Sequence, residues 1–323
     1  MVGAILAYYM PILHIKIARQ HSMLEQLKTC SECHFGSASN YFLFYRPDRQ
    51  GVIVELVEKN IVITGAGSGI GRALAVKFKA MGARCIVAVD IDAEKLAATA
   101  QAIDCVAVAA DVSDPDAILA VIDKTENEYG PIDLFCSNAG IARAPALESP
   151  GHEWQASWDI NVMAHVYAAR YLVPRMVSRG GGYFMHTASA AGLLNQIGGA
   201  AYGTTKHAAV GFGEWLAMTY GHQGIKVSML CPQAVRTAMT VPQDVDMISN
   251  TEKALSLGDK AIAAASMDGM IEPEQLADAV VEGLREERFL ILPHPEVLDY
   301  MQRKASDYDR WLGGMNRLVQ KLS

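Results

Sequence analysis

Cysteine, positive charge and long apolar runs are all scarce in this chain of 323 residues. It has six cysteines, too few for a disulfide scaffold at this length, and Cys85, Cys136 and Cys231 lie in apolar runs where buried thiols are common. The net charge of −7 argues against broad binding to nucleic acid or to an anionic membrane. The apolar stretch 2–13 is shorter than the ~20 residues of a spanning helix. We therefore expect a soluble, cytoplasmic protein with no membrane span.

The first 51 residues differ in charge from the rest. They carry a net charge of +2, from five basic and three acidic residues, whereas the remainder carries −9. A basic leader and a small-residue cleavage site, the marks of a signal peptide, are not clear. We predict a short amphipathic helix over 5–28 and a loop over 29–51. Residues 1–51 are interpreted as an extension of unknown role, with export or anchoring as a minor alternative, and 52–323 as a single domain.

One motif in this extension has three interpretations. Cys30-Ser-Glu-Cys33-His34 matches the attachment pattern of c-type haem, but that chemistry requires export and an axial ligand. A metal site built from the same residues would need a fourth ligand, which is not evident. We therefore adopt the third interpretation, a chance match, and predict no metal site.

Beyond residue 52, short β-branched runs alternate with helical patterns. The predicted strands are 61–64, 85–89, 105–109, 132–137, 182–187, 225–230 and 289–292, and the predicted helices are 70–81, 93–102, 114–129, 153–178, 200–222 and 273–286. Asp92 and Asp114 precede two of the helices as N-caps. Such alternation predicts an α/β fold with a doubly wound Rossmann topology: a seven-stranded parallel sheet with helices on both faces.

The stretch from Asn60 to Asp90 reads as strand, glycine-rich turn, helix, strand and acid. Gly65, Gly69 and Gly71 follow the first strand with the spacing G-x-x-x-G-x-G. A glycine-rich turn alone is weak evidence, because many are ordinary turns. The complete unit predicts a dinucleotide site, with a pyrophosphate on the helix N-terminus and a ribose on the carboxylate of Asp90.

Two further clusters follow predicted strands. Asp111-Val112 comes after the third strand, and Ser137-Asn138-Ala139-Gly140 ends the fourth. Ligands of open parallel sheets bind beyond the carboxyl ends of the strands, so both clusters should face the glycine turn. The alternative for Asp111 is a turn or cap residue, which is the commoner role of an aspartate there.

Tyr202 and Lys206 are four residues apart in a helical stretch and therefore share one face. A tyrosine acts as a base at neutral pH only if its anion gains ~4 kcal/mol, part of which a neighbouring ammonium can supply. Ser189 follows the 182–187 strand and should reach the same crevice, although a turn serine is the plainer interpretation. Asn161 is interior to a predicted helix, where an exposed residue is the plainer interpretation.

Together these motifs resemble the short-chain dehydrogenase/reductase family, in its shorter single-domain branch, over about residues 54–292. The family's catalytic tetrad corresponds to Asn161, Ser189, Tyr202 and Lys206. Two departures are Ser137, where the family motif begins with Asn, and His186, where Asn is common; a third is Gln233, where a glycine follows Pro232 in the family. The cofactor-binding residues implied by the resemblance and the motifs are Gly65, Ser68, Gly69, Ile70, Gly71, Asp90, Ile91, Asp111, Val112, Asn138, Ala139, Gly140, Tyr202, Lys206, Pro232, Val235 and Thr237.

The resemblance implies an oxidoreductase that acts on a secondary alcohol or ketone. Tyr202 would exchange the proton, Lys206 would lower its pKa and bind the nicotinamide ribose, Ser189 would polarise the substrate oxygen, and Asn161 would hold a relay water. It also implies a homodimer or homotetramer through helices 153–178 and 200–222. A same-fold epimerase or dehydratase and a non-enzymatic NAD-binding regulator remain alternatives.

The preferred cofactor can be argued from charge. The carboxylate of Asp90 can accept two hydrogen bonds from a ribose diol and would repel a 2′-phosphate. A phosphate-binding site would place a basic residue at Ser68 or Ile91, and neither is basic. The sequence therefore predicts NAD in preference to NADP.

The substrate is predicted only as a hydrophobic small molecule. Segment 238–272 corresponds to the family's substrate lid and is rich in apolar residues, and Leu193, Leu194 and Ile197 suggest an apolar pocket. A steroid, an aryl alcohol and a hydroxyacyl group all remain open. The tail 294–323 is predicted as helical with a break at Gly313-Gly314, packed on its own core or over a neighbour's site.

Overall fold

Parallel strands form the centre of the fold. The computed structural model describes residues 55–240 and 269–322, together with the single positions 258, 260, 263 and 266. In that part of the chain the sheet has seven strands in the order β3-β2-β1-β4-β5-β6-β7. Their bounds are β1 (Asn60–Thr64), β2 (Cys85–Asp90), β3 (Val106–Ala109), β4 (Leu134–Ser137), β5 (Gly182–Thr187), β6 (Ile225–Leu230) and β7 (Leu290–Ile291). The fold class predicted from the sequence is confirmed.

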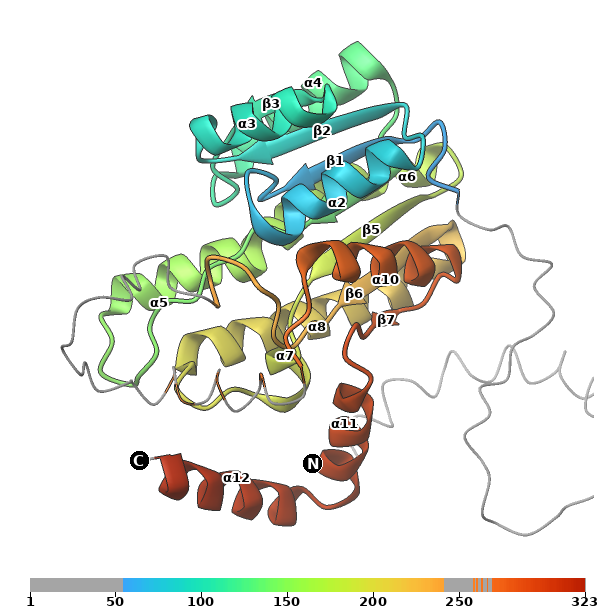
Figure 1. The fold of residues 1–323 in the computed structure, drawn as a ribbon. Coiled ribbons are helices and arrows are strands. Elements are labelled where there is room, and N and C mark those ends of the chain that lie inside the picture. Colours follow the sequence, from blue (N-terminus) through green and yellow to red (C-terminus); the bar gives the residue numbers. More distant parts are fainter. Residues whose placement is uncertain are drawn as a thin grey trace, which may run out of the picture. The chain divides into compact units, whose positions relative to one another are not determined.

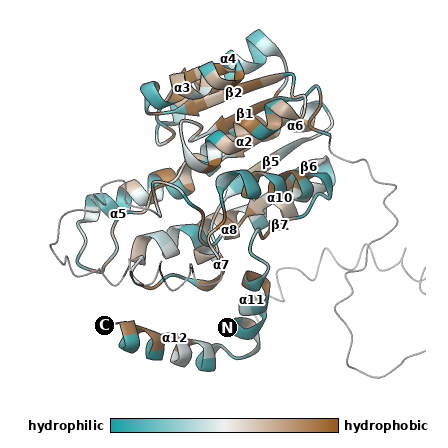
Figure 2. Ribbon diagram, viewed as in Figure 1, coloured by the Kyte–Doolittle hydropathy of each residue, from teal (hydrophilic) through white to brown (hydrophobic). Residues whose placement is uncertain are grey.

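Helices cover both faces of the sheet because alternate strand residues point to opposite sides. Ile61 and Ile63 belong to one core and Val62 to the other. The first core is covered by α2 (Gly69–Ala80), α3 (Ala93–Ile103) and α10 (Pro273–Arg285), and the second by α4 (Pro115–Tyr129), α6 (Ala164–Ser178) and α8 (Ala200–Tyr220). Figure 1 shows α2 and α10 side by side over the sheet, and Figure 2 shows β1 and β2 as predominantly hydrophobic ribbons.

The strand order reverses direction at β1, which pairs with β2 on one side and with β4 on the other. Connections from β1 and β4 therefore run to opposite faces and leave a crevice at the carboxyl edge of the sheet. The predicted N-caps are confirmed, since the side chain of Asp92 accepts from Lys95 N and that of Asp114 from Asp116 N.

The prediction of one continuous α-helix over 153–178 is wrong in the middle of the segment, where the winding changes. The segment is α5 (Gly151–Trp158), a π-helical turn at Asp159–Met163 and then α6. A π turn inserts one extra residue into an otherwise continuous helix, often at a functional site. Apolar periodicity alone does not reveal it, because the buried stripe continues on both sides.

The C-terminal helices also differ from the prediction. The break lies at Asp307, between α11 (Glu296–Ser306) and α12 (Tyr308–Leu322), and not at Gly313-Gly314, which α12 runs through. The carboxylate of Asp307 accepts from Arg310 N at 2.9 Å, so this aspartate starts a new helix. A glycine inside a helix costs only about 1 kcal/mol, which does not end it.

The predictions for residues 1–51, including the Cys30-x-x-Cys33-His34 pattern, and most of those for the 238–272 lid lie outside the described residues. The two short helical elements not yet mentioned are α7 (Ala191–Leu194) and a 3-10 turn at Gly221–Gln223. No helix within the described residues is long and apolar enough to cross a membrane.

Candidate active site

A cavity of about 560 Å³ lies at the carboxyl edge of the sheet. Its lining comes from the ends of six strands and from α8. Every predicted catalytic or cofactor-binding residue lines it, with the exception of Gly71 and Asn161. Motifs that are separated by more than a hundred residues in sequence therefore share one site, as the topology requires.

The glycine turn brings the start of α2 close to the end of β4. Gly65 has a φ of +66°, and a Cβ atom there would lie 2.9 Å from the Cα of Ala139. A Cβ at Gly71 would lie 2.1 Å from the carbonyl oxygen of Gly65, so Gly71 acts through packing and not as part of the cavity wall. Ser68 is the N-cap of α2 without a side-chain cap bond, and the first turn has no acidic residue. The N–H groups of that turn can therefore receive an anion.

Asp90 ends β2 with a fixed carboxylate. Its Oδ2 accepts from Gly67 N at 2.9 Å and its Oδ1 accepts from Asp92 N at 3.0 Å. Each carboxylate oxygen retains a second acceptor position, so the group can still receive hydroxyl donors from the cavity. The neighbouring Ile91 is 70% exposed and carries no charge.

The two later clusters differ in how their side chains are used. Asn138 joins three strand ends: its amide donates to Thr64 O at 3.0 Å and its carbonyl accepts from Thr187 Oγ1 at 3.0 Å. Asp111 lines the cavity, but its Oδ1 accepts from both the N–H and the hydroxyl of Ser113. The carboxylate of Asp111 is therefore used as that of a turn residue, which is the alternative given above.

Tyr202, Ser189 and Lys206 meet at the other end of the cavity. The Ser189 hydroxyl lies 3.4 Å from the carbonyl of Pro232 and accepts from Ala191 N at 3.1 Å, and it is close enough to the Tyr202 hydroxyl to lower the pKa of that group. The ammonium of Lys206 donates to Thr187 O at 2.9 Å and lies 5.7 Å from the centroid of the Tyr202 ring. The phenol of Tyr202 and the ammonium of Lys206, on one face of α8, thus lie beside the hydroxyl of Ser189, which follows β5.

The ionisation of these groups is set mainly by burial. Desolvation raises the pKa of Tyr202, and the Ser189 hydroxyl opposes that rise. Burial also lowers the pKa of Lys206 from 10.5 to about 8. The expectation that Lys206 lowers the pKa of Tyr202 is not met by these side chains alone, because the ammonium is directed at the Thr187 carbonyl and is itself costly to keep charged.

Asn161 is fully buried, so the exposed-residue interpretation is wrong. It lies in the π turn, where its Oδ1 accepts from Ile141 N and its Nδ2 donates to Ile141 O, both at 2.9 Å. The amide also donates to Thr205 Oγ1 at 3.1 Å. A Cβ at Gly140 would lie 3.2 Å from both Asn161 Oδ1 and Lys206 Nζ. Asn161 therefore fixes the loop after β4 against α8 beside Lys206.

Ser137 and His186, two of the departures from the family pattern, both contact His165, a residue that the sequence analysis did not select. His165 Nδ1 lies 2.7 Å from the hydroxyl of Ser137 and 3.3 Å from His186 Nδ1. Burial lowers the pKa of His165 below its usual value and that of His186 to about 3, so both imidazoles are neutral near pH 7. Ser137 and His186 thus form one buried polar cluster below the site.

The apolar side of the cavity differs in part from the prediction. Ile141, Ala142, Ile160 and Met239 line it, whereas Leu193, Leu194 and Ile197 do not. Leu193 packs against the core under α4, α6 and α8 instead. Met239 belongs to the apolar 238–272 segment from which such a pocket is predicted, whereas Ile141 and Ala142 come from the loop after β4 and Ile160 from the π turn, where no apolar periodicity marks them.

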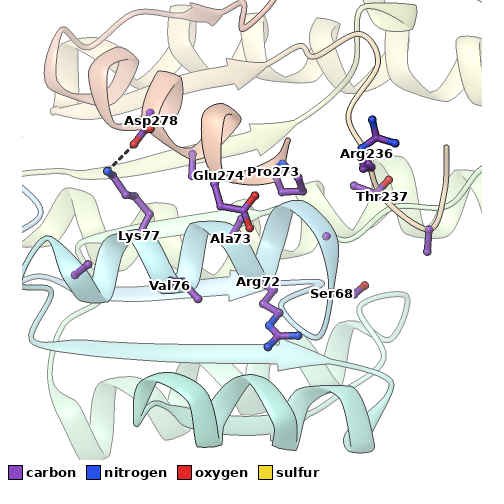
Figure 3. A pocket seen from close by; sticks show the side chains of 14 residues that line it. Ser68, Arg72, Ala73, Val76, Lys77, Arg236, Thr237, Pro273, Glu274 and Asp278 are labelled. Atoms are coloured by element: carbon purple, nitrogen blue, oxygen red, sulfur yellow. Dashed lines mark ion pairs between the residues drawn. The ribbon is translucent and has the colours of Figure 1, made fainter. Parts of the chain in front are cut away.

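A second cavity, of about 740 Å³, lies between α2 and α10. Figure 3 shows Lys77 of α2 and Asp278 of α10 reaching toward each other across it, at 2.5 Å. Ser189, Tyr202 and Lys206 are not among the described residues that line it. The charged groups that line it, among them Lys77, Glu274 and Asp278, are not accompanied there by the Tyr202 hydroxyl or the glycine turn at Gly65. In the described part of the chain no group of three or more His, Cys, Asp or Glu is placed to hold a metal ion.

Comparison with known proteins agrees with this geometry. The family model for short chain dehydrogenase matches residues 59–247, which contain both the glycine turn and the helix of Tyr202 and Lys206. The 1-deoxy-11-beta-hydroxypentalenate dehydrogenase of Streptomyces exfoliatus is 32% identical over 252 residues, covering 75% of this chain and 86% of the relative.

Two solved structures show the same fold. A short chain dehydrogenase/reductase from Burkholderia phymatum in complex with NAD has a TM-score of 0.70 at 30% identity and covers 79% of this chain and 95% of its own. L-sorbose reductase from Gluconobacter frateurii, complexed with NADPH and L-sorbose, has a TM-score of 0.64 at 28% identity and covers 74% and 95%. Nicotinamide dinucleotides of both kinds thus occur among the similar structures.

Proposed function

Because this chain belongs to the short-chain dehydrogenase family of oxidoreductases, we propose that it transfers a hydride between a hydrophobic secondary alcohol or ketone and NAD(H), with Tyr202 as general acid and base. The observation that carries the proposal is the cavity that holds the glycine turn, Asp90, Ser189, Tyr202 and Lys206 together. Bound NAD(H) would supply the hydride acceptor or donor and, when oxidised, a positive charge beside Tyr202.

The residues present fit such a cofactor from end to end. Asp90 and Asp111 follow β2 and β3, the N-terminal turn of α2 follows β1, and Thr237 lies against that turn, where a Cβ at Gly69 would be 3.1 Å from its Cγ2. Pro232 lies beside Ser189, whose hydroxyl is 3.4 Å from its carbonyl. The collision that a Cβ at Gly65 would make with Ala139 shows how closely the backbone is packed beside this turn. Adenosine, pyrophosphate and nicotinamide would each meet groups of suitable chemistry.

Proton transfer would take place at the Tyr202 hydroxyl. In reduction, the phenol gives its proton to the substrate oxygen, which the Ser189 hydroxyl holds in place. In oxidation, the phenolate must form first, and at pH 7 this costs at least ~4 kcal/mol because desolvation raises the pKa further. Lys206 brings a positive charge close to Tyr202, and Asn161 fixes the loop beside it.

The preference for NAD over NADP rests on Asp90. Its carboxylate would accept the ribose hydroxyls and repel a 2′-phosphate, and the flanking Ser68 and Ile91 offer no positive charge. The hydrophobic substrate is supported by the apolar lining at Ile141 and Met239, and by the Streptomyces relative named for 1-deoxy-11-beta-hydroxypentalenate.

The test is a panel of secondary alcohols and ketones, assayed with the full chain and with both cofactors through the absorbance of the reduced nicotinamide. Tyr202→Phe should lower kcat at least ~100-fold with little change in cofactor affinity. Tyr183→Phe is the matched control, because it also removes a buried tyrosine hydroxyl. That hydroxyl lies 2.8 Å from Ser228 Oγ and does not line the cavity, so this variant should keep its activity.

Each part of the proposal has its own contrary result. Undiminished turnover in Tyr202→Phe would remove Tyr202 from the mechanism. Greater activity with NADPH than with NADH would overturn the cofactor assignment. Tight NADH binding without turnover across the panel would favour a cofactor-binding regulator.

A further inference from the structure

The turn after β6, Pro232–Val235, lines the cavity and begins beside the site, since Pro232 O lies 3.4 Å from the Ser189 hydroxyl. The family glycine is replaced in this turn by Gln233. The backbone of Gln233 is not in the positive-φ region, so the turn does not need a glycine. On the cavity side the turn is tied to the Ser189 loop, because Ala190 N donates to Pro232 O at 2.8 Å. The side chain that ties its opposite side is His294.

His294 is 2% exposed and follows β7. Its Nδ1 accepts from Gln233 N at 3.2 Å, and its Nε2 donates to Ala234 O at 3.1 Å. A backbone N–H can only donate and a carbonyl can only accept, so the two bonds together select the neutral imidazole with its proton on Nε2. One side chain thus fixes two successive peptide groups of the turn.

The sequence around His294 makes this contact rigid. Pro293 and Pro295 flank it, and the residue before a proline is restricted to extended conformations. The imidazole is therefore presented from a backbone with little freedom. Ala234 O also accepts from Ile271 N at 3.1 Å, so the same peptide is held from a second element.

We propose that His294 is a positioning residue for the nicotinamide half of the cofactor. This proposal rests on the proposed function. His294 acts through the backbone of Gln233 and Ala234, without touching the cofactor. Its effect is specific: loss of His294 weakens binding of the nicotinamide half and leaves the adenosine and pyrophosphate contacts at Gly65 and Asp90 unchanged.

The experiment compares NADH with ADP-ribose, which lacks the nicotinamide, by calorimetric titration of the full chain. His294→Phe keeps the ring but loses both hydrogen bonds, and should raise the Kd for NADH roughly tenfold while changing that for ADP-ribose less than about twofold. His294→Gln places an amide N–H near the position of Nε2, can donate again to Ala234 O, and should recover part of the NADH affinity.

Asn60→Leu is the matched control for general destabilisation. Asn60 is buried at the amino end of β1, where its Nδ2 donates to Tyr129 O at 2.9 Å and to Pro131 O at 3.0 Å. It should lower the unfolding temperature and leave the ratio of the two Kd values unchanged.

The outcomes separate the two proposals. If the wild-type chain binds NADH and His294→Phe weakens both ligands equally or neither, the role of His294 is refuted and the proposed function stands. If the wild-type chain binds no nicotinamide dinucleotide, the proposed function fails and the role of His294 fails with it.

Discussion

Lys206 gives a quantitative test of the site, because keeping its buried ammonium charged lowers the free energy of unfolding. The side chain is 2% exposed, and burial lowers its pKa from 10.5 to about 8. That difference corresponds to about 3 kcal/mol by which the folded state disfavours the ammonium. Lys206→Met removes this cost, while loss of the bond to Thr187 O returns about 1 kcal/mol. The variant should therefore be about 2 kcal/mol more stable than the wild type near pH 7.

The stability advantage of Lys206→Met over the wild type should fall as the pH rises. Below about pH 8, Lys206 is protonated in both the folded and the unfolded chain, and the full cost applies. Between about 8 and 10.5 the folded chain releases the proton and the unfolded chain keeps it, so wild-type stability rises relative to the variant. The advantage should vanish at about pH 9.5 to 10, and above that the variant should be the less stable by up to ~1 kcal/mol, because only the lost bond to Thr187 O remains. Cys231, whose pKa burial raises to about 12, acts oppositely above pH 9. Its pKa is also lowered by the charge of Lys206, so the comparison is cleanest when the titration is repeated in a Cys231→Ala background.

The assay is urea unfolding of the full chain and of Lys206→Met, near pH 7 and again near pH 10, without added nucleotide. The catalytic activity of the variant should be lost while its stability rises, as expected where an active site is built at a cost to the fold. A variant less stable than the wild type near pH 7, or an advantage that does not change with pH, would show that the buried ammonium is not the source of strain.

Two further predictions concern the adenosine end. Asp90→Asn combined with Ile91→Arg should shift the ratio of kcat/KM values at least tenfold toward NADPH, since it removes a repelling charge and adds a guanidinium; an unchanged ratio in steady-state kinetics would contradict this. Gly65→Ala should weaken NADH binding more than tenfold in titrations, because its Cβ meets Ala139 Cα at 2.9 Å. Gly82→Ala shares the positive φ but meets its first neighbour at 3.6 Å, so it should lose stability and keep its affinity.

The strand and helix positions could be predicted because local pattern and fold agree. Ile61 to Thr64 is β-branched and buried on both faces, and the helices between strands carry a single apolar stripe. The carboxyl-edge rule then placed the glycine turn, Asn138 and Tyr202 at one cavity without any knowledge of distances.

What the sequence could not reveal depends on tertiary contact. The burial of Asn161 depends on a π turn, and the pKa of Tyr202 depends on how much water its hydroxyl loses. His165 and His294 carry no sequence motif, and each is explained only by the partners that the fold brings to it. The assembly expected through the α6 and α8 helices stays a prediction; the exposed Trp215 on α8 is a residue it would use.

The π turn at Asp159–Met163 has a consequence for the direction in which side chains point. In an α-helix each residue advances by about 100° around the axis, so one extra residue in a wider turn rotates everything after it by about that angle. The α5 and α6 segments can therefore face different neighbours, α8 and α4, within one uninterrupted rod. Asn161 lies in the π turn, between the part of the helix that faces α8 and the part that faces α4, and its side chain is buried there. Removing a single residue from this rod would restore ordinary winding and turn either the asparagine or the apolar stripe of α6 to the outside.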